Sequence, residues 1–165
     1  MRIFNLLFTI TLCALLGSLS SSAHAAADAI KISSAAQVEI EVIGKDGKKT
    51  LQRIFPVKAI PGTEVIYTNT FENVIDKVVS NIVINNAIPN DSEYKAGSAF
   101  GKDCEILFSA DGGKKFAHAE ELKTTDAAGK ERFALAKEYT HIRWIYKGQL
   151  AAGKSGEIGF RAVIK

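Results

Sequence analysis

Cysteine, proline and net charge are all scarce in this 165-residue chain. Two cysteines exclude a small domain held together by several disulfides. Three prolines and thirteen glycines exclude a collagen-like chain. A formal charge of +3 is too small to indicate a polyanionic partner, and we expect no binding of nucleic acid. Hydrophobic residues nevertheless make up 47% of the chain, enough to bury a core, which excludes a disordered protein.

The first 25 residues have the pattern of a cleaved export signal. Arg2 gives a short positive start, residues 3–16 are mostly apolar, and Ala23-His24-Ala25 fits the small-residue cleavage pattern. We therefore expect cleavage after Ala25. The alternative is an uncleaved membrane anchor, but the apolar run is shorter than the roughly 20 residues that span a bilayer.

Cleavage would leave 140 residues (165 − 25), in which Cys104 is the single cysteine. A lone cysteine forms no internal disulfide, so the stability of the fold must come from its core. No later stretch is long and apolar enough to span a membrane. We expect an exported protein of the periplasm or cell surface, with a spacer at residues 26–34 and a single domain at residues 35–165.

Alternation of apolar and polar residues dominates the expected domain. It is clear at residues 38–42, 142–146 and 158–164, and a period of two is typical of half-buried strands. Asp46-Gly47 is a strong hairpin signal. The pattern predicts an all-β fold, an antiparallel immunoglobulin-like or fibronectin-like β-sandwich of about 7–9 strands.

Further strands are expected in less regular parts of the chain. They cover residues 50–60, 64–71, 78–84 and 104–108, with a short piece at 94–99. Pro56 lacks an amide donor, which predicts a bend or a sheet edge. Alternation points Cys104 inward, where a thiol is typically inert. The polar segment 117–138 is ambiguous, with a helical turn expected near residues 134–138.

Seven short segments carry a recognisable family pattern. They are residues 61–70 (PGTEVIYTNT), 83–89 (VINNAIP), 94–99 (YKAGSA), 108–113 (FSADGG), 140–144 (THIRW), 150–156 (LAAGKSG) and 160–162 (FRA). In this order they resemble a bacterial surface-repeat domain of unknown function (number eleven), from about Val38 to the C-terminus. The resemblance implies an immunoglobulin-like sandwich on an exported protein. Such domains often occur in tandem, whereas this chain holds a single copy, and the family offers no catalytic residues.

Ser109-x-Asp111-x-Gly113-x-x-Phe116 resembles an Asp-box. In such a hairpin a serine and an aspartate hydrogen-bond backbone groups, and a glycine takes a positive φ. We interpret these four residues as a structural hairpin turn. The alternative is the remnant of a glycosidase, which would need two inward-facing carboxylates, and the sequence identifies no such pair.

Metal and catalytic sites find little support in the sequence. His118 and His141 are the only histidines after residue 25, whereas a zinc site needs three or four ligands. Cys104 and His141 would form a nucleophile–base pair only if the thiol were accessible. Gly112-Gly113 and Gly153-x-x-Gly156 lie in expected hairpin turns, outside the strand-to-helix context of a phosphate loop. We expect no catalytic residue, cofactor or metal.

Charged clusters fall at expected turns. Lys45, Lys48 and Lys49 form one basic cluster, and Lys114-Lys115 forms another. Lysines at hairpin tips typically keep strand edges from pairing, and an anionic glycan or lipid headgroup is the alternative. Residues 90–93 (NDSE) supply two acids, which is weak support for a calcium site.

The combined pattern predicts a non-enzymatic exported module that contacts another envelope protein. The contact would use a sheet edge or face, by strand addition or docking. The alternative is a binding module for envelope glycan or another small ligand, using exposed aromatic side chains such as Tyr94, Phe100 or Phe133. The oligomeric state is left open.

Overall fold

The computed structural model describes residues 29–165, so the expected export signal and its cleavage after Ala25 lie outside the described residues. The described chain forms eleven strands and one 3-10 turn, η1 (Ala136–Glu138). The strands are β1 (Ile30–Ile43), β2 (Lys49–Ile54), β3 (Glu64–Asn73), β4 (Val83–Ala87), β5 (Ser92–Tyr94), β6 (Phe100–Gly101), β7 (Cys104–Ser109), β8 (Lys123–Thr125), β9 (Glu131–Phe133), β10 (His141–Tyr146) and β11 (Ser155–Ile164). The fold is all-β as expected. Its strands outnumber the expected 7–9 because several have only two or three residues.

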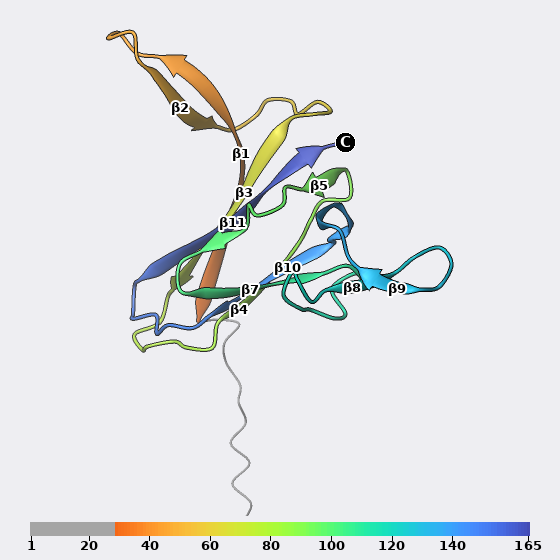
Figure 1. Ribbon diagram of the computed structural model, residues 1–165. Coiled ribbons are helices and arrows are strands. Elements are labelled where there is room, and N and C mark those ends of the chain that lie inside the picture. The colour runs from red at the N-terminus through yellow and green to blue at the C-terminus, as the bar shows by residue number, and fades with distance from the viewer. Residues whose placement is uncertain (1–28) are drawn as a thin grey trace, which may run out of the picture.

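Two antiparallel sheets form a β-sandwich (Figure 1). The larger sheet has the order β2-β1-β3-β11-β5, with β6 also paired to β11. The smaller sheet has the order β4-β10-β7, and β8 with β9 forms a separate hairpin. Two hairpins project from the sandwich in Figure 1, β1–β2 at one end and β8–β9 at one side.

The core lies between β11 and β10. Ile158, Phe160 and Ala162 alternate along β11 and have no exposed surface. Ile142 and Trp144 alternate along β10 and are at most 1% exposed. The Trp144 and Phe160 rings meet across the sandwich with centroids 6.3 Å apart. The expected alternation at both segments is therefore confirmed.

The first strand begins earlier than expected. β1 starts at Ile30, and residues 30–37 pair with residues 66–73 of β3. The expected spacer at residues 26–34 was wrong from residue 30 onward, and the folded domain starts before residue 35. Ile30 and Ile32 continue the apolar–polar alternation upstream of the small polar residues, which is consistent with the earlier start of the strand.

The strand expected at residues 50–60 is shorter than predicted. β2 ends at Ile54, and Pro56 lies in the connection to β3. Proline has no amide hydrogen and cannot donate to a ladder, so the chain does not resume the strand after it. The strand thus ends before Pro56 and is not bent by it, while the expected sheet edge is confirmed, because β2 is the edge strand of the larger sheet.

Two other expected strands were misplaced. Within residues 78–84 only Val79 pairs before β4, in an isolated bridge with Leu150, and β4 runs from Val83 to Ala87. Asn81 has a φ of 57°, a left-handed conformation that interrupts an extended chain. In residues 94–99 the strand ends at Tyr94, because Gly97 takes a φ of 72° in a turn.

The ambiguous segment 117–138 contains β8, β9 and η1. The helical turn expected near residues 134–138 is present as the 3-10 turn. Glu138 holds it in place: its carboxylate pairs with Arg132 at 2.5 Å and accepts the Leu135 amide at 2.7 Å. These bonds, above all the one from Arg132, lower the pKa of Glu138 to about 2.

A buried asparagine closes the end of the sandwich from which β3 exits. Asn73 has no exposed surface, and its side-chain amide donates to the backbone oxygens of Lys77 at 2.7 Å and Leu150 at 2.8 Å. Its side-chain oxygen accepts the amide of Ile75 at 3.1 Å. These bonds join the chain after β3 to the chain before β11.

Candidate interaction site

The turn after β7 forms the hydrogen bonds of an Asp-box. Ser109 is fully buried, and its hydroxyl donates to Asp111 Oδ1 at 2.8 Å and accepts the Gly113 amide at 3.0 Å. Asp111 Oδ1 also accepts the amides of Lys114 and Lys115 at 3.0 Å each. Gly113 has a φ of 82°. The Asp111 carboxylate is thus engaged by the turn itself, and its pKa is lowered chiefly by the Lys115 amide.

Phe116 lies where the chain leaves this turn. The guanidinium carbon of Arg143 is 3.8 Å from the centre of the Phe116 ring. Arg143 also donates to Asn85 Oδ1 at 2.7 Å, and Ala117 bridges to Phe108 beside β7. The contact between Phe116 and Arg143 therefore holds the chain that follows the turn against the smaller sheet.

The candidate nucleophile and base are far apart. Cys104 pairs with Tyr146, and His141 pairs with Ser109, at opposite ends of the β7–β10 ladder. Five residue steps of roughly 3.4 Å separate them by about 17 Å. Cys104 is half-buried against the core, and burial, with a smaller contribution from Asp103, raises the pKa of its thiol.

The histidines do not gather metal ligands. His118 Nε2 lies 3.3 Å from Glu105 Oε1, and His141 lies beside Gly113 on the other side of the turn. Within residues 29–165 no three His, Cys, Asp or Glu side chains come together as a metal site would require.

The hairpin of residues 38–54, which we call the arm, stands clear of the sandwich (Figure 1). β1 pairs with β3 up to Gln37 and with β2 from Val38 onward. Every residue of β2 is exposed. Among the described residues β2 pairs with β1 alone, so its other edge presents unpaired backbone groups.

The two faces of the arm differ in charge. Residues directly opposite in an antiparallel pair share a face. One face is uncharged and consists of Val38, Ile40, Val42, Thr50, Gln52 and Ile54. The other consists of Glu39, Glu41, Ile43, Lys49, Leu51 and Arg53. On this second face Leu51 is 69% exposed and Ile43 is 65% exposed, so the most exposed apolar side chains of the arm lie near its tip.

The basic cluster lies at that tip. Lys45, Lys48 and Lys49 surround a turn in which Gly47 takes a φ of 78°. Lys48 is 3.6 Å from Asp46, and Lys49 is 2.7 Å from Glu41. The tip from Lys45 to Lys49 thus carries three lysines against one aspartate.

An ion network fixes the base of the arm. Arg161 on β11 donates to both carboxylate oxygens of Glu39, at 2.9 and 3.0 Å, and to Glu64 at 2.8 Å. Lys95 is 2.6 Å from Glu64, and Arg53 is 3.4 Å from Glu39. The hydrogen bond from Arg161 is the main cause that lowers the pKa of Glu39, and the one from Lys95 does so for Glu64.

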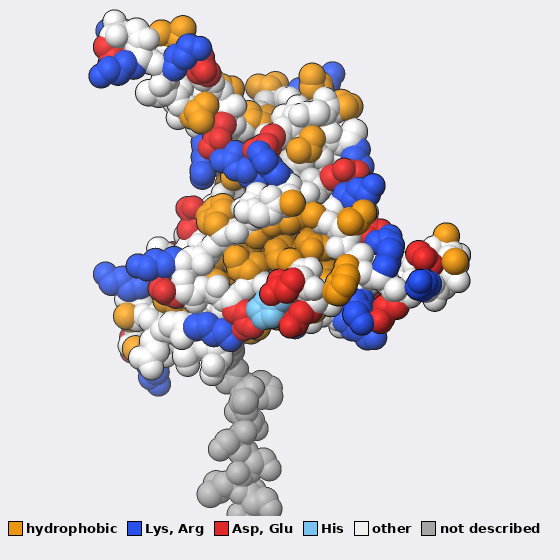
Figure 2. Space-filling model, in the orientation of Figure 1, with side chains coloured by type: hydrophobic (Ala, Val, Ile, Leu, Met, Phe, Trp, Pro, Cys, Tyr) orange, Lys and Arg blue, Asp and Glu red, His pale blue; other side chains and the backbone are white. Residues whose placement is uncertain are grey.

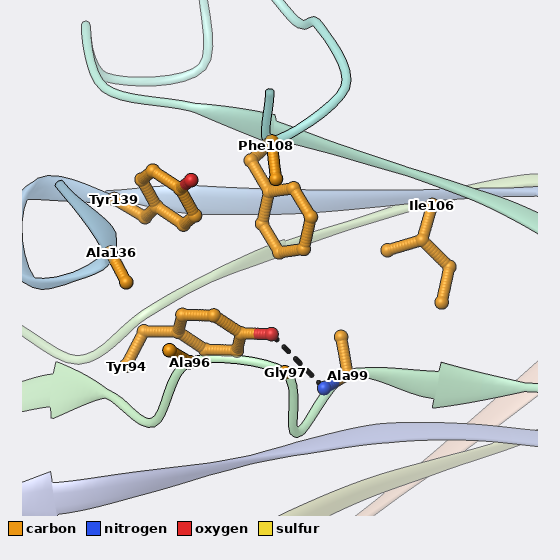
Figure 3. Close-up of a pocket in the computed structure, with 9 residues that line it drawn as sticks. Tyr94, Ala96, Gly97, Ala99, Ile106, Phe108, Ala136 and Tyr139 are labelled. Carbon is orange, nitrogen blue, oxygen red and sulfur yellow. Dashed lines mark hydrogen bonds between the residues drawn. The ribbon is translucent and has the colours of Figure 1, made fainter. Parts of the chain in front are cut away.

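A cavity of about 300 Å³, which we call the hollow, opens between β5–β6 of the larger sheet and β7 of the smaller one (Figure 3). Its lining residues are Tyr94, Ala96, Gly97, Ala99, Ile106, Phe108, Ala119, Ala136 and Tyr139. Tyr94, Phe108 and Tyr139 pack together with ring centroids 4.8 to 5.7 Å apart. The Tyr94 hydroxyl accepts the Ala99 amide at 3.1 Å. Five lining residues are alanine or glycine, so the space above the three largely buried rings is left open.

The margin of the hollow carries acidic groups. Figure 2 shows an apolar depression on this face with acidic side chains along one border. Glu120 and Glu121 are exposed and directly follow Ala119 of the lining. Burial is the main cause that raises the pKa of Tyr139, and Tyr94 and then Glu120 add smaller contributions. Glu105 precedes Ile106, and its carboxylate also pairs with Lys147 at 2.5 Å.

The three aromatic residues considered for glycan binding lie in different environments. Tyr94 is 5% exposed and belongs to the core. Phe100 is half-buried, and its ring covers Gly159, where an added Cβ would lie 2.7 Å from it. Phe133 is 61% exposed on the β8–β9 hairpin. The structure does not bring these three side chains to one surface.

The hairpin of the arm was expected from Asp46-Gly47 and is confirmed, whereas its projection from the sandwich and the hollow were not expected. Apolar residues at 43 and 51 beside an Asp-Gly turn, in strands flanked by lysines, were the available signal for an exposed hairpin tip. The hollow had no local signal, because its lining comes from separate segments around Tyr94, Phe108, Ala119 and Tyr139.

No protein-family model matches the chain, and no curated protein matches it. The resemblance to the surface-repeat domain therefore stays a prediction. No helix within residues 29–165 has the length and hydropathy of a membrane span.

Proposed function

We propose that this chain is an exported, non-enzymatic β-sandwich module that acts by contact with another protein of the cell envelope. The observation that supports this most directly is the exposed arm. A two-stranded hairpin alone is marginally stable in water, and exposed apolar side chains often mark interaction surfaces. Leu51 and Ile43 would lose their contact with water if a partner covered the tip.

The unpaired edge of β2 is the second part of the proposed contact surface. It offers backbone donors and acceptors along Lys49–Ile54, to which an extended segment of a partner can add as a strand. Main-chain bonds of this kind supply affinity, and the side chains of the arm supply specificity.

The compartment and the absence of catalysis are also part of the proposal. Export rests on the sequence pattern that ends at Ala25. A non-enzymatic role is supported by the separation of Cys104 from His141 and by the engagement of Asp111 within its own turn.

Site-specific photo-crosslinking tests this proposal. A photoreactive amino acid replaces Leu51 in the arm, and a matched control replaces Thr125 in the β8–β9 hairpin, which is also exposed and projecting. We expect a discrete protein adduct in envelope fractions from position 51 and none from position 125. The absence of an adduct at position 51, or the same adducts at both positions, would contradict the proposal.

A second candidate function is the binding of a small apolar ligand, for which the aromatic lining of the hollow is the favouring observation. Titration with a dye that fluoresces in apolar surroundings tests it. Binding should be lost when Ala119→Phe fills the hollow and kept in Ala127→Phe, where the change lies in the β8–β9 turn. Envelope glycan has weaker support, because of the three aromatic residues considered only Phe133 is well exposed.

A further inference from the structure

We infer that the hollow of one copy of this chain receives the arm tip of a second copy. The inference rests on the proposed function, and it names the partner in that contact as the chain itself. It draws on two features that lie far apart on one molecule, the apolar and basic tip and the apolar and acid-bordered hollow (Figures 1 and 2).

The apolar groups of the two features match in size. Ile43 lies opposite Lys49, so Leu51 is its diagonal neighbour on the same face of the arm. The hollow has a volume of about 300 Å³. At about 30 Å³ per water molecule this equals roughly ten waters, which is room for two branched aliphatic side chains. Insertion would cover Ile43 and Leu51 together with Ala96, Ile106 and Ala119, the apolar lining residues that are still accessible to solvent.

The charges of the two features are complementary. Three lysines surround the tip, and two acids, Asp46 and Glu41, pair with Lys48 and Lys49, so the tip keeps a net positive charge. Glu120 and Glu121 lie at the border of the hollow, beside Ala119. Opposite charges around an apolar centre steer association and fix its orientation. The lysines of the tip would meet these glutamates while the apolar side chains enter.

The contact must join two copies. The arm points away from the body in Figure 1, and the bonds of Arg161 to Glu39 hold it in that direction, so the tip does not reach its own hollow. A tip on one copy and a hollow on the next form a heterologous contact. Repetition of such a contact gives an open chain or a closed ring, in which every copy uses both features.

The first experiment measures the mass of the purified protein by sedimentation velocity as its concentration and salt are raised. We expect the mean mass to rise with concentration and to fall in high salt, because the charges that steer the contact are exposed. Leu51→Glu in the tip and Ala119→Phe in the hollow should each weaken association at least about tenfold, as expected from the loss of one buried aliphatic contact.

Matched controls separate these effects from general changes of the surface. Val57→Glu places the same charge on an exposed apolar residue outside the arm. Ala127→Phe adds the same ring at a turn far along the β8–β9 hairpin. Both controls should associate like the unmodified protein.

Mixing the two variants gives the decisive result. The Leu51→Glu copy keeps an intact hollow, and the Ala119→Phe copy keeps an intact tip. At a concentration where the unmodified protein associates, each variant alone should be mostly monomeric, whereas their mixture should form a 1:1 dimer that does not grow further. A symmetric contact between like surfaces would not show this complementation.

Other results would overturn the inference. A protein that stays monomeric at all concentrations does not bind its own copies. If position 51 then crosslinks to a different envelope protein, the proposed function stands without this inference, and if it crosslinks to nothing, both fail. If Ala119→Phe abolishes binding of the apolar dye but leaves self-association unchanged, the hollow is a small-ligand site and the inference is wrong.

Discussion

Arg161 on β11 donates hydrogen bonds to both carboxylate oxygens of Glu39 on β1, although the two residues lie 122 positions apart in sequence. A guanidinium that donates two bonds to one carboxylate fixes distance and direction together. Glu39 lies just beyond the last residue of β1 paired to β3, at the start of the arm. This pair therefore sets the direction in which the arm leaves the sandwich.

Glu39→Gln should loosen the arm without unfolding the body. The amide side chain keeps the size of glutamate but removes the charge that holds Arg161 and Arg53. Ion pairs that stay partly accessible to solvent contribute little to stability, so we expect amide hydrogen exchange in residues 39–54 to accelerate about two- to fivefold, with the core strands unchanged. Glu41→Gln, which loses only the bond to Lys49 inside the arm, is the control. Equal acceleration in both variants would argue against the role of Arg161.

Ser109→Ala should weaken the turn after β7. The hydroxyl accepts the Gly113 amide and donates to Asp111, and alanine replaces neither bond. Loss of a buried hydrogen-bonding group typically costs about 1–3 kcal/mol, which urea denaturation would detect. Ser33→Ala on the exposed part of β1 should leave the midpoint unchanged. An unchanged midpoint for Ser109→Ala would show that the turn does not depend on this hydroxyl.

Gly156→Ala should destabilise the core although the change is a single methyl group. A Cβ at position 156 would lie 2.3 Å from Cζ of Phe71, and Phe71 is 2% exposed and has little room to move. Overpacking of this kind costs about 1–3 kcal/mol in the free energy of unfolding. Gly44→Ala is the control for denaturant unfolding, because its Cβ would press only on the flexible Asp46 side chain and would meet the Lys48 backbone oxygen at an ordinary 3.5 Å. Equal stability of both variants would contradict the prediction.

The sequence revealed the strands whose alternation coincides with burial. Trp144 and Phe160 follow a period of two and face the core, because both sheets cover them. Val38, Ile40 and Val42 show the same period, yet Ile40 is 39% exposed on the arm. The period tells which residues share a face, but what covers that face depends on distant segments. The direction of the arm depends on such distant contacts, because Arg161 on β11 bonds to Glu39 at its base.

The candidate site was harder to predict for the same reason. The Asp-box lies within eight consecutive residues from Ser109 to Phe116, so its hydrogen bonds could be anticipated from local spacing. The hollow combines Tyr94 at the end of β5 with Phe108 on β7 and Tyr139 after η1. Pairing between such segments depends on the sheet order, and a single sequence does not contain that order.

Because Glu138 pairs with Arg132, the free energy of unfolding should depend on pH in the acid range. The pKa of Glu138 is about 2, below the ordinary value of 4.5, because Arg132 and the Leu135 amide bind its charged form. A carboxyl group whose pKa is lowered on folding stabilises the folded state at pH values above its pKa in the unfolded chain. For Glu138 this stabilisation is lost as the pH falls from about 4.5 to about 2. The stability difference between the unmodified protein and Glu138→Gln should therefore shrink across this range. Glu131→Gln, at a more exposed ion pair, should show a smaller change, and a pH-independent difference would contradict the assignment.

Cys104 should react slowly with alkylating reagents in the folded protein. The thiolate is the nucleophile, and burial together with the nearby Asp103 raises the pKa of this thiol, so less of it is ionised at pH 8. Its sulfur also donates to the Lys102 backbone oxygen at 3.4 Å. We expect iodoacetamide to modify the folded chain several-fold more slowly than the chain in urea, with mass spectrometry as the readout. Asp103→Asn should speed the reaction slightly, because it removes the smaller of the two causes while burial persists. Equal rates in the folded and unfolded chains would mean that Cys104 is freely accessible at the edge of β7.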